Sequence, residues 1–260
     1  IKRTSLSTYR SQRRGGRGVQ GASSREEDFV EHLFVANTHS YILFFTDKGK
    51  CYWVKVYDIP EGGRAAKGRA IVNLIGCEPD EKVSAFISVK EFNEDHYVVM
   101  ATEKGMVKKT KLSAYSNPRK KGIYAVEIRD GDRLIEARVS TGDNDILLGT
   151  RNGKSIRFSE EQIRASGRKT MGVKGITLSS EDDRLVGMLL IKREGTVLVA
   201  TEKGFGKRTE ISQYRAQKRG GKGVLTMKTT DKVGKMVTIK EVVDKDCLLY
   251  TSPSPRDSLS

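Results

Sequence analysis

The chain has 260 residues, 37% of them hydrophobic, which is enough for one large domain or two small domains with buried cores. Lys and Arg number 48 against 33 Asp and Glu; the resulting net charge of +15 favours a polyanionic partner, nucleic acid before membrane. No apolar run approaches the ~18 residues of a membrane span, and the three cysteines and three histidines are too scattered for a zinc site or a disulfide framework.

The first distinctive segment is a run of arginine and glycine, Gln12-Arg13-Arg14-Gly15-Gly16-Arg17-Gly18. Glycines let another chain approach closely, successive backbone N–H groups in such a turn can bind an anion, and guanidinium groups match phosphate geometry. A solvated basic loop would explain a single run equally well. The run recurs as Gln217-Lys218-Arg219-Gly220-Gly221-Lys222-Gly223, with two Arg/Lys exchanges. This recurrence predicts a contact with a nucleic-acid backbone.

A four-residue pattern, T-x-[KN]-G, divides the chain into units of roughly 50 residues. It occurs at Thr46–Gly49, Thr102–Gly105, Thr150–Gly153 and Thr201–Gly204. A short apolar run precedes each copy, and a partly alternating run follows it. A glycine turn between two β-prone runs predicts a hairpin.

Each unit continues with a basic residue, a glycine and another β-prone run. The basic turns are Lys67-Gly68, Lys121-Gly122, Lys174-Gly175 and Lys222-Gly223, with Arg17-Gly18 as the earliest copy. A further apolar run then closes the unit, at Val83–Val89, Leu134–Val139, Leu185–Ile191 and Met236–Val243. About four short strands per unit predict an all-β fold of propeller-like blades. Helical periodicity is nearly absent, and Ser159–Gln162 is expected to cap one short turn.

Both ends of the chain interrupt the repeat. Ile1–Leu6 matches only the strand that follows the T-x-[KN]-G turn, so we expect four complete units between two broken ones, a piece of a larger ring. Cys247–Asp257 contains two prolines where a strand and hairpin are due, and it resembles the translation of a sequencing adapter. We therefore expect residues 1–246 to form the domain and residues 247–260 to be adapter read-through and not native protein.

Several of these segments resemble a known family, the C-terminal domain of the bacterial DNA gyrase A subunit, part of a type IIA topoisomerase. Gln12–Gly18 matches that family's box, Q-[RK]-R-G-G-[RK]-G, at every position. Glu26–Tyr57, Gly68–Leu74 and Gly204–Thr209 resemble further landmarks. The resemblance implies a six-bladed β-pinwheel, here truncated at both ends, whose blades exchange a strand and whose basic rim wraps duplex DNA.

The resemblance also implies a role without catalysis for this fragment. The family's DNA-cleaving tyrosine belongs to the N-terminal breakage-reunion region of the same polypeptide, so we expect no catalytic residue and no cofactor here. ATP and Mg²⁺ would serve the partner, the gyrase B subunit, in a cytoplasmic A2B2 assembly at the nucleoid. The module would bind duplex DNA without sequence preference and enable negative supercoiling. The expected DNA-binding residues are Gln12, Arg13, Arg14, Gly15, Gly16, Arg17, Gly18, Lys67, Arg69, Lys120, Lys121, Lys174, Lys218, Arg219 and Lys222.

Two other functions are compatible with the repeat. The related topoisomerase IV A subunit has a similar C-terminal domain that typically lacks an intact box, and Gln12–Gly18 is intact. A propeller could instead serve as a protein-interaction platform, but such a platform would not need a net charge of +15 or a basic turn in each unit. The second run, Gln217–Gly223, is not required by the family pattern, and which of the two runs dominates stays open.

Overall fold

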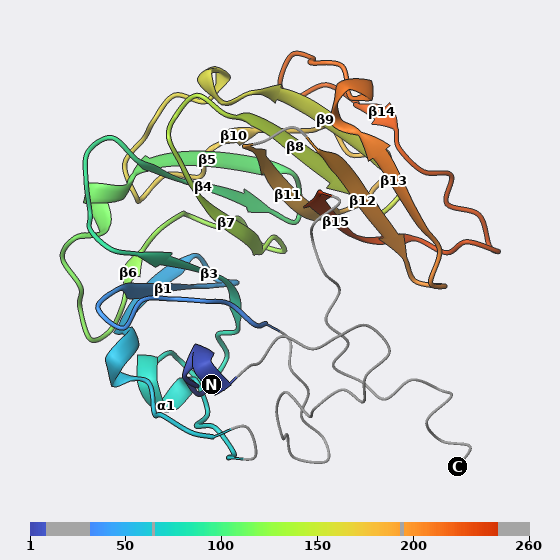
Figure 1. Cartoon of the computed structure of the whole chain (residues 1–260). Coiled ribbons are helices and arrows are strands. Elements are labelled where there is room, and N and C mark those ends of the chain that lie inside the picture. Colours follow the sequence, from blue (N-terminus) through green and yellow to red (C-terminus); the bar gives the residue numbers. More distant parts are fainter. Residues whose placement is uncertain (9–31, 64–65, 193–194, 244–260) are drawn as a thin grey trace, which may run out of the picture.

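The computed structural model describes residues 1–8, 32–63, 66–192 and 195–243, and it consists mainly of β-sheet. Four antiparallel sheets stand side by side along an arc (Figure 1). Their strand orders are β3-β1-β2-β6, β10-β5-β4-β7, β11-β8-β9-β14 and β13-β12-β15. We call these sheets blades 1 to 4. The predicted all-β, propeller-like fold is confirmed.

Each blade contains a long central hairpin, an inner strand and, in blades 1 to 3, a two-residue outer strand. The hairpins are β1 (Tyr41–Thr46) with β2 (Lys50–Lys55), β4 (Tyr97–Thr102) with β5 (Met106–Lys111), β8 (Asp145–Thr150) with β9 (Lys154–Ser159), and β12 (Thr196–Thr201) with β13 (Gly206–Glu210). The inner strands are β3 (Val83–Val89), β7 (Leu134–Ser140), β11 (Leu185–Ile191) and β15 (Met236–Val242). The outer strands are β6 (Ile123–Tyr124), β10 (Val173–Lys174) and β14 (Val224–Leu225).

Helical structure is confined to single turns. The 3-10 turns are η1 (Leu6–Thr8), η2 (Val56–Asp58), η3 (Leu112–Tyr115), η4 (Glu160–Gln162) and η5 (Ile211–Gln213), and the one α-helix of the described residues is α1 (Val72–Ile75). Each of η2 to η5 directly follows the second strand of a hairpin. The turn expected at Ser159–Gln162 is confirmed as η4, where the Ser159 side chain accepts a hydrogen bond from the backbone N–H of Glu161.

The T-x-[KN]-G pattern forms the hairpin turns, as predicted. Its glycines have positive φ angles, for example 78° at Gly49 and 83° at Gly153. The threonine hydroxyl stabilises the turn, since Thr46 Oγ1 accepts a hydrogen bond from the Lys50 N–H at 3.2 Å. At Gly153 a Cβ atom would lie 2.0 Å from the carbonyl oxygen of Met227, so the glycine is also required for close packing against the next unit.

The outer strand of each four-stranded blade comes from the following unit of the chain. β6 follows β5 in the sequence but pairs with β2 of blade 1, where Ile123 faces Cys51. β10 and β14 pair in the same way with β5 and β9. In the part of the chain that the structure describes, β13 of blade 4 pairs only with β12. The blades thus exchange strands, as the resemblance implied.

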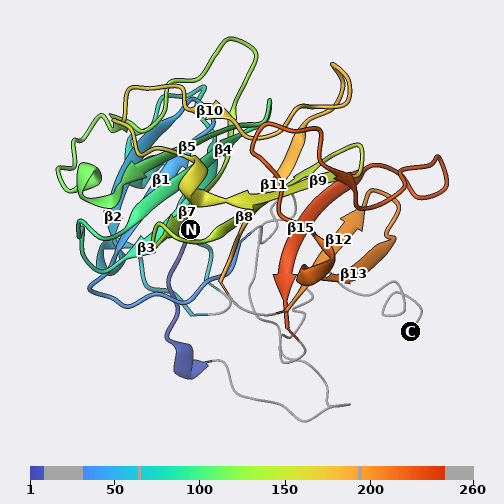
Figure 2. The same cartoon turned by 90° about the horizontal axis from the view of Figure 1, so that it is seen from above.

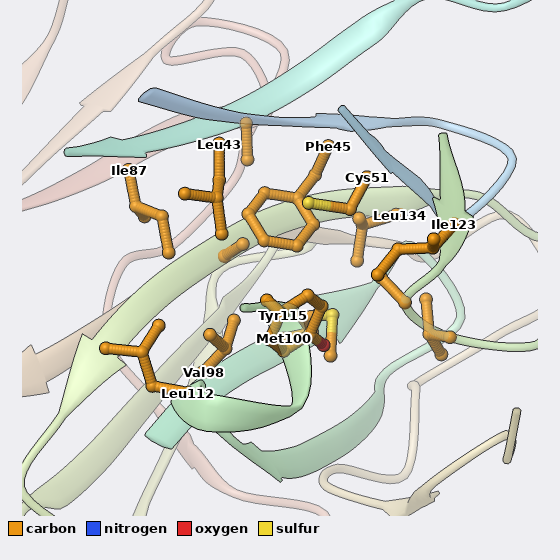
Figure 3. Packing of buried hydrophobic residues seen from close by; sticks show 14 of the residues in the cluster. Leu43, Phe45, Cys51, Ile87, Val98, Met100, Leu112, Tyr115, Ile123 and Leu134 are labelled. Carbon is orange, nitrogen blue, oxygen red and sulfur yellow. The ribbon is translucent and has the colours of Figure 1, made fainter. Parts of the chain in front are cut away.

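The hydrophobic core lies between neighbouring blades. Between blades 1 and 2, Leu43 and Phe45 of β1 pack with Val98 and Met100 of β4 and with Tyr115 of η3 (Figure 3). The rings of Phe45 and Tyr115 meet edge to face at 5.9 Å between centroids. Burying a side chain of this size stabilises the fold by about 1.5–3 kcal/mol. Because the central strands are covered on both faces, they are apolar along nearly their whole length.

The blades have an inner edge and an outer edge. The inner strands β3, β7, β11 and β15 contact one another from blade to blade. Figure 2 shows the same array from above, with β12, β13 and β15 at one end. The outer edge consists of the outer strands and the loops that precede them, and we call it the rim. The loops 116–122, 163–172 and 214–223, which connect a 3-10 turn to an outer strand, are the rim loops.

Candidate nucleic-acid interface

The rim loops carry the chain from one blade to the previous one. Each begins at a 3-10 turn, crosses the outside of the neighbouring blade and ends in the outer strand that pairs there. In two of them the start of the crossing is fixed by the same hydrogen bond: the Ser166 N–H donates to the Lys109 carbonyl, and the Gln217 N–H donates to the Arg157 carbonyl. These two loops therefore begin their crossings at equivalent positions of blades 2 and 3.

The residues at the start of the chain contact the loop that precedes β3 as β9 contacts the rim loop 214–223. Arg3 forms an isolated parallel bridge with Glu61, as Arg157 does with Ala216 in the last unit. The Lys2 ammonium group donates to the carbonyl oxygens of Gly63 and Ala66 at 3.0 and 2.8 Å. The loop that contains Lys67 and its neighbours is thereby held against Ile1–Thr4 in the manner of a rim loop.

The predicted DNA-binding residues that the structure describes lie on the rim or on this first loop. Lys67, Arg69, Lys120, Lys121, Lys174, Lys218 and Lys222 are exposed, whereas Arg219 is half-buried. Lys174 lies on outer strand β10, and the others lie in or beside loops. The first arginine-glycine run, Gln12, Arg13, Arg14, Gly15, Gly16, Arg17 and Gly18, lies outside the described residues.

The second run has a defined backbone path. Gly220 and Gly223 have φ angles of 83° and 68°. The Gly220 N–H donates to the Gly175 carbonyl at 2.8 Å, and Thr177 donates from its N–H and its hydroxyl to the carbonyls of Gly221 and Gly220. A Cβ atom at Gly223 would lie 2.4 Å from the carbonyl oxygen of Ser155. These glycines therefore allow the loop to pack against the protein's own strands.

One predicted equivalence needs correction. The sequence aligned Lys174-Gly175 with Lys121-Gly122, but the strand registers place Val173 opposite Val107 as Ile123 is opposite Cys51. The positive-φ glycine of the third unit is therefore Gly172, at 83°, and the residue before it is Met171. Lys174 occupies a strand position equivalent to that of Tyr124.

Sequence reasoning missed other cations of the rim loops. Arg119, Arg164, Lys169 and Arg215 are exposed there, and Arg168 is half-buried. The signal that could have found them is loop length, because the loops 163–172 and 214–223 each have ten residues. Aligning the loops from their 3-10 turns would have placed Arg168 opposite Arg219.

A buried lysine attaches the third unit's rim loop to blade 2. The Lys108 side chain is enclosed, and its Nζ donates to the carbonyl oxygens of Ala125 and Arg168 at 2.8 and 2.5 Å. Burial, and then the nearby positive charge of Arg168, lowers the pKa of Lys108 to about 8. The ammonium group thus joins the segment that follows outer strand β6 to the rim loop 163–172.

Cations at the hairpin turns and cations on the rim have different partners. At the T-x-[KN]-G turns the arginines pair with carboxylates: Arg133 and Arg184 contact Glu103 at 2.8 and 3.6 Å, and Arg151 contacts Glu202 at 2.8 Å. Lys104 and Lys203 at the same turns donate to backbone carbonyls, those of Asp130 and Asp231. Within the described ranges, no ion pair includes Lys120, Lys121, Lys174, Lys218 or Lys222. These five lysines of the rim are therefore not paired with carboxylates of the described chain, which suits an external polyanion.

Strand-exchanged blades with a cationic outer edge define a β-propeller-type domain. Comparisons with known proteins identify the family to which this domain belongs. The family model described as "DNA gyrase C-terminal domain, beta-propeller" matches residues 1–37, 40–90, 96–141, 144–192 and 195–242. The chain belongs to this family.

Related sequences agree with the family. The chain is 51% identical over 249 residues to the DNA gyrase A subunit of Clostridium acetobutylicum, in an alignment that covers 96% of this chain and 30% of the relative. It is 44% identical over 255 residues to that of Mycolicibacterium smegmatis, where the alignment covers 97% of this chain and 30% of the relative. The chain thus spans about a third of the length of these relatives.

Solved structures share the fold. The C-terminal domain of DNA topoisomerase IV superposes with a TM-score of 0.77 at 27% identity, covering 94% of this chain and 74% of that one. A DNA gyrase A C-terminal domain superposes with a TM-score of 0.73 at 24% identity, covering 94% and 79%. The described residues contain no helix long and apolar enough to cross a membrane. They also contain no group of three or more His, Cys, Asp and Glu side chains that could hold a metal ion.

Proposed function

We propose that this chain binds duplex DNA along its rim without reading base sequence, and bends the DNA around the blades. The observation that carries the proposal is the row of exposed cations without carboxylate partners on successive rim loops. Lys and Arg at such positions contact phosphates, which fix the path of a duplex but carry no sequence information. The curated relatives carry the name of DNA gyrase, which supports a DNA substrate.

The energetics favour many spaced contacts over a few strong ones. Bending 20–30 bp of duplex through 40–90° costs on the order of 1–6 kcal/mol. Cations repeated once or more per blade, such as Lys121, Lys174 and Lys222, can offset that cost only if each segment of the duplex is held in turn. A strand-exchanged array supports this because every rim loop is attached to two blades.

We infer a corresponding role in the intact gyrase polypeptide. The module would present wrapped DNA to the breakage-reunion region as a crossing of fixed hand, and ATP hydrolysis by the gyrase B subunit in an A2B2 assembly would convert that crossing into negative supercoils. The setting would be the bacterial cytoplasm, at the nucleoid. The C-terminal domain of topoisomerase IV is the second candidate, and it is disfavoured because the curated relatives at 43–51% identity carry the gyrase name.

The test is the salt dependence of DNA binding in matched double variants. If 6–10 phosphates are neutralised, affinity should fall roughly 10³–10⁵-fold between 50 and 200 mM salt. Replacing Lys120 and Lys121 with Ala should reduce the slope of log K against log salt by about 1.8. Replacing Lys104 and Lys203, which lie at the hairpin turns, removes the same charge and should leave the slope unchanged.

Two outcomes would contradict the proposal. A flat salt response of the wild-type chain would favour a protein-interaction platform. Equal slopes for the two double variants would mean that net charge, and not the rim, attracts the DNA. Filter binding with duplexes of unrelated sequence measures both quantities and checks that base sequence is not read.

A further inference from the structure

The second arginine-glycine run contains two kinds of cation. Lys218 and Lys222 are exposed, and no carboxylate of the described chain pairs with them. Arg219, between them, is half-buried and points its donors at the protein itself. The three cations of the run therefore cannot be treated as equivalent phosphate contacts.

Arg219 connects three separate pieces of the rim. Its backbone N–H donates to Gln162 Oε1 at 2.8 Å and its Nε donates to the Gln162 carbonyl at 3.3 Å. Its Nη1 donates to the carbonyl oxygen of Lys174 at 2.5 Å. Gln162 ends η4 next to blade 3, whereas Lys174 lies on outer strand β10 of blade 2. One side chain thus holds the fourth unit's rim loop to two earlier segments.

Gln162 completes the contact from the other side. Its side-chain oxygen accepts from Arg219 while its Nε2 donates to the Gln217 carbonyl at 3.4 Å. Beyond Arg219, the bonds of Gly220 and Thr177 continue the contact between the two rim segments. Arg219 therefore stands at the start of a seam that joins the third unit's outer strand to the fourth unit's loop.

The chemistry of this position requires arginine. A guanidinium group has five donors in a rigid plane and can bind two carbonyl oxygens on different segments at once. A lysine ammonium at the same place would keep the positive charge but would lack the separate Nε and Nη1 donors. A phosphate contact, by contrast, tolerates lysine, as the Arg/Lys exchanges between the two runs illustrate at the positions of Lys218 and Lys222.

We propose that Arg219 is a positioning residue of the rim: it clasps the third and fourth units together and so sets the path on which Lys174, Lys218 and Lys222 hold DNA. It does this from within the protein and does not itself bind phosphate. The inference rests on the proposed DNA-bending function. It assigns to the second run, Gln217–Gly223, a structural role in addition to phosphate binding.

The decisive variants are Arg219→Lys and Gln162→Ala, with Lys218→Ala as the control. Arg219→Lys keeps the charge and Gln162→Ala removes none, so both should leave the salt slope of DNA binding unchanged. Both should nevertheless lower the bend of a short duplex labelled at its ends for energy transfer. Lys218→Ala should reduce the slope by about 0.9 and leave the protein seam intact.

Hydrogen exchange in the free full chain tests the clasp without DNA. Both clasp variants should speed exchange of the Thr177 and Gly220 amides, while amides of β4 in blade 2 keep their wild-type protection. Normal bending by both variants would overturn the proposal, as would a reduced salt slope in Gln162→Ala. Failure of the wild-type chain to bend DNA would instead refute the proposed function, and unchanged exchange in the variants would refute the clasp independently.

Discussion

The junction between blades 2 and 3 contains a buried ion pair, and its removal should destabilise the fold strongly. Lys109 Nζ on β5 lies 3.0 Å from Glu160 Oε1 on η4, and the two side chains are 8% and 0% exposed. Ser140 and Asn144 donate to the other carboxylate oxygen. Lys109 also donates to the Gly142 carbonyl at 3.0 Å and lies 4.4 Å from the centroid of the Tyr97 ring.

Glu160→Gln keeps the shape of the side chain but leaves the buried ammonium group without its counter-ion. Removing one partner of a buried pair costs about 3–5 kcal/mol. For a domain of this size each kcal/mol shifts the melting temperature by about 2–4 °C, so we expect a fall of about 6–20 °C. Adding Lys109→Met removes the orphaned charge, and the double variant should recover most of the loss.

A matched control lies on the same strand. Lys111 Nζ contacts Glu94 Oε2 at 2.9 Å, but those side chains are 52% and 66% exposed. Glu94→Gln should barely change the melting temperature, because solvent and salt screen an exposed pair. Calorimetry of the wild type and these variants decides the matter. If Glu160→Gln melts no lower than Glu94→Gln, the pair does not hold the blades together.

Two further predictions concern charge. The lowered pKa of Lys108, about 8, means that the unfolded chain keeps this proton between about pH 8 and 10.5 while the folded chain releases it. The stability of the wild type relative to Lys108→Met should therefore rise over that range in urea titrations, and a flat or falling difference would contradict the burial argument. Replacing Arg13, Arg14 and Arg17 with Ala in the complete enzyme should abolish negative supercoiling and retain strand passage and much of the DNA affinity. Normal supercoiling would make Gln217–Gly223 the better candidate for wrapping.

The hairpins could be predicted from sequence because their causes are local. The glycine of each T-x-[KN]-G copy has a positive φ, and in the first three copies the threonine hydroxyl accepts from the N–H directly after the pattern. The exchanged outer strands are different. β6 has only two residues and pairs with a strand some 70 positions earlier, so neither length nor alternation reveals it. Strand exchange was therefore expected only from the family resemblance.

The candidate site was predicted by residue type, and its internal organisation was not. Lys121 and Lys222 directly precede the turn glycines Gly122 and Gly223, and both are exposed, as is Lys218. Arg219 has the same composition around it, yet its donors reach carbonyls of two other segments, a contact that depends on tertiary structure. The wrong alignment of Lys174 has a simpler cause. The sequence offers two candidate turn glycines, Gly172 and Gly175, and only the positive φ of Gly172 shows which one forms the turn.

The blades are joined by side-chain contacts that differ from one junction to the next. One strand position contacts the next unit in blades 1 to 3, and each uses a different chemistry. Trp53 Nε1 donates to the Tyr115 carbonyl, Lys109 pairs with Glu160, and Arg157 Nη1 donates to the carbonyls of Ile211 and Tyr214. The backbone scaffold repeats while the side chains that join its blades do not. If the rim bends DNA as proposed, we expect the spacing of its cations to depend on each junction separately.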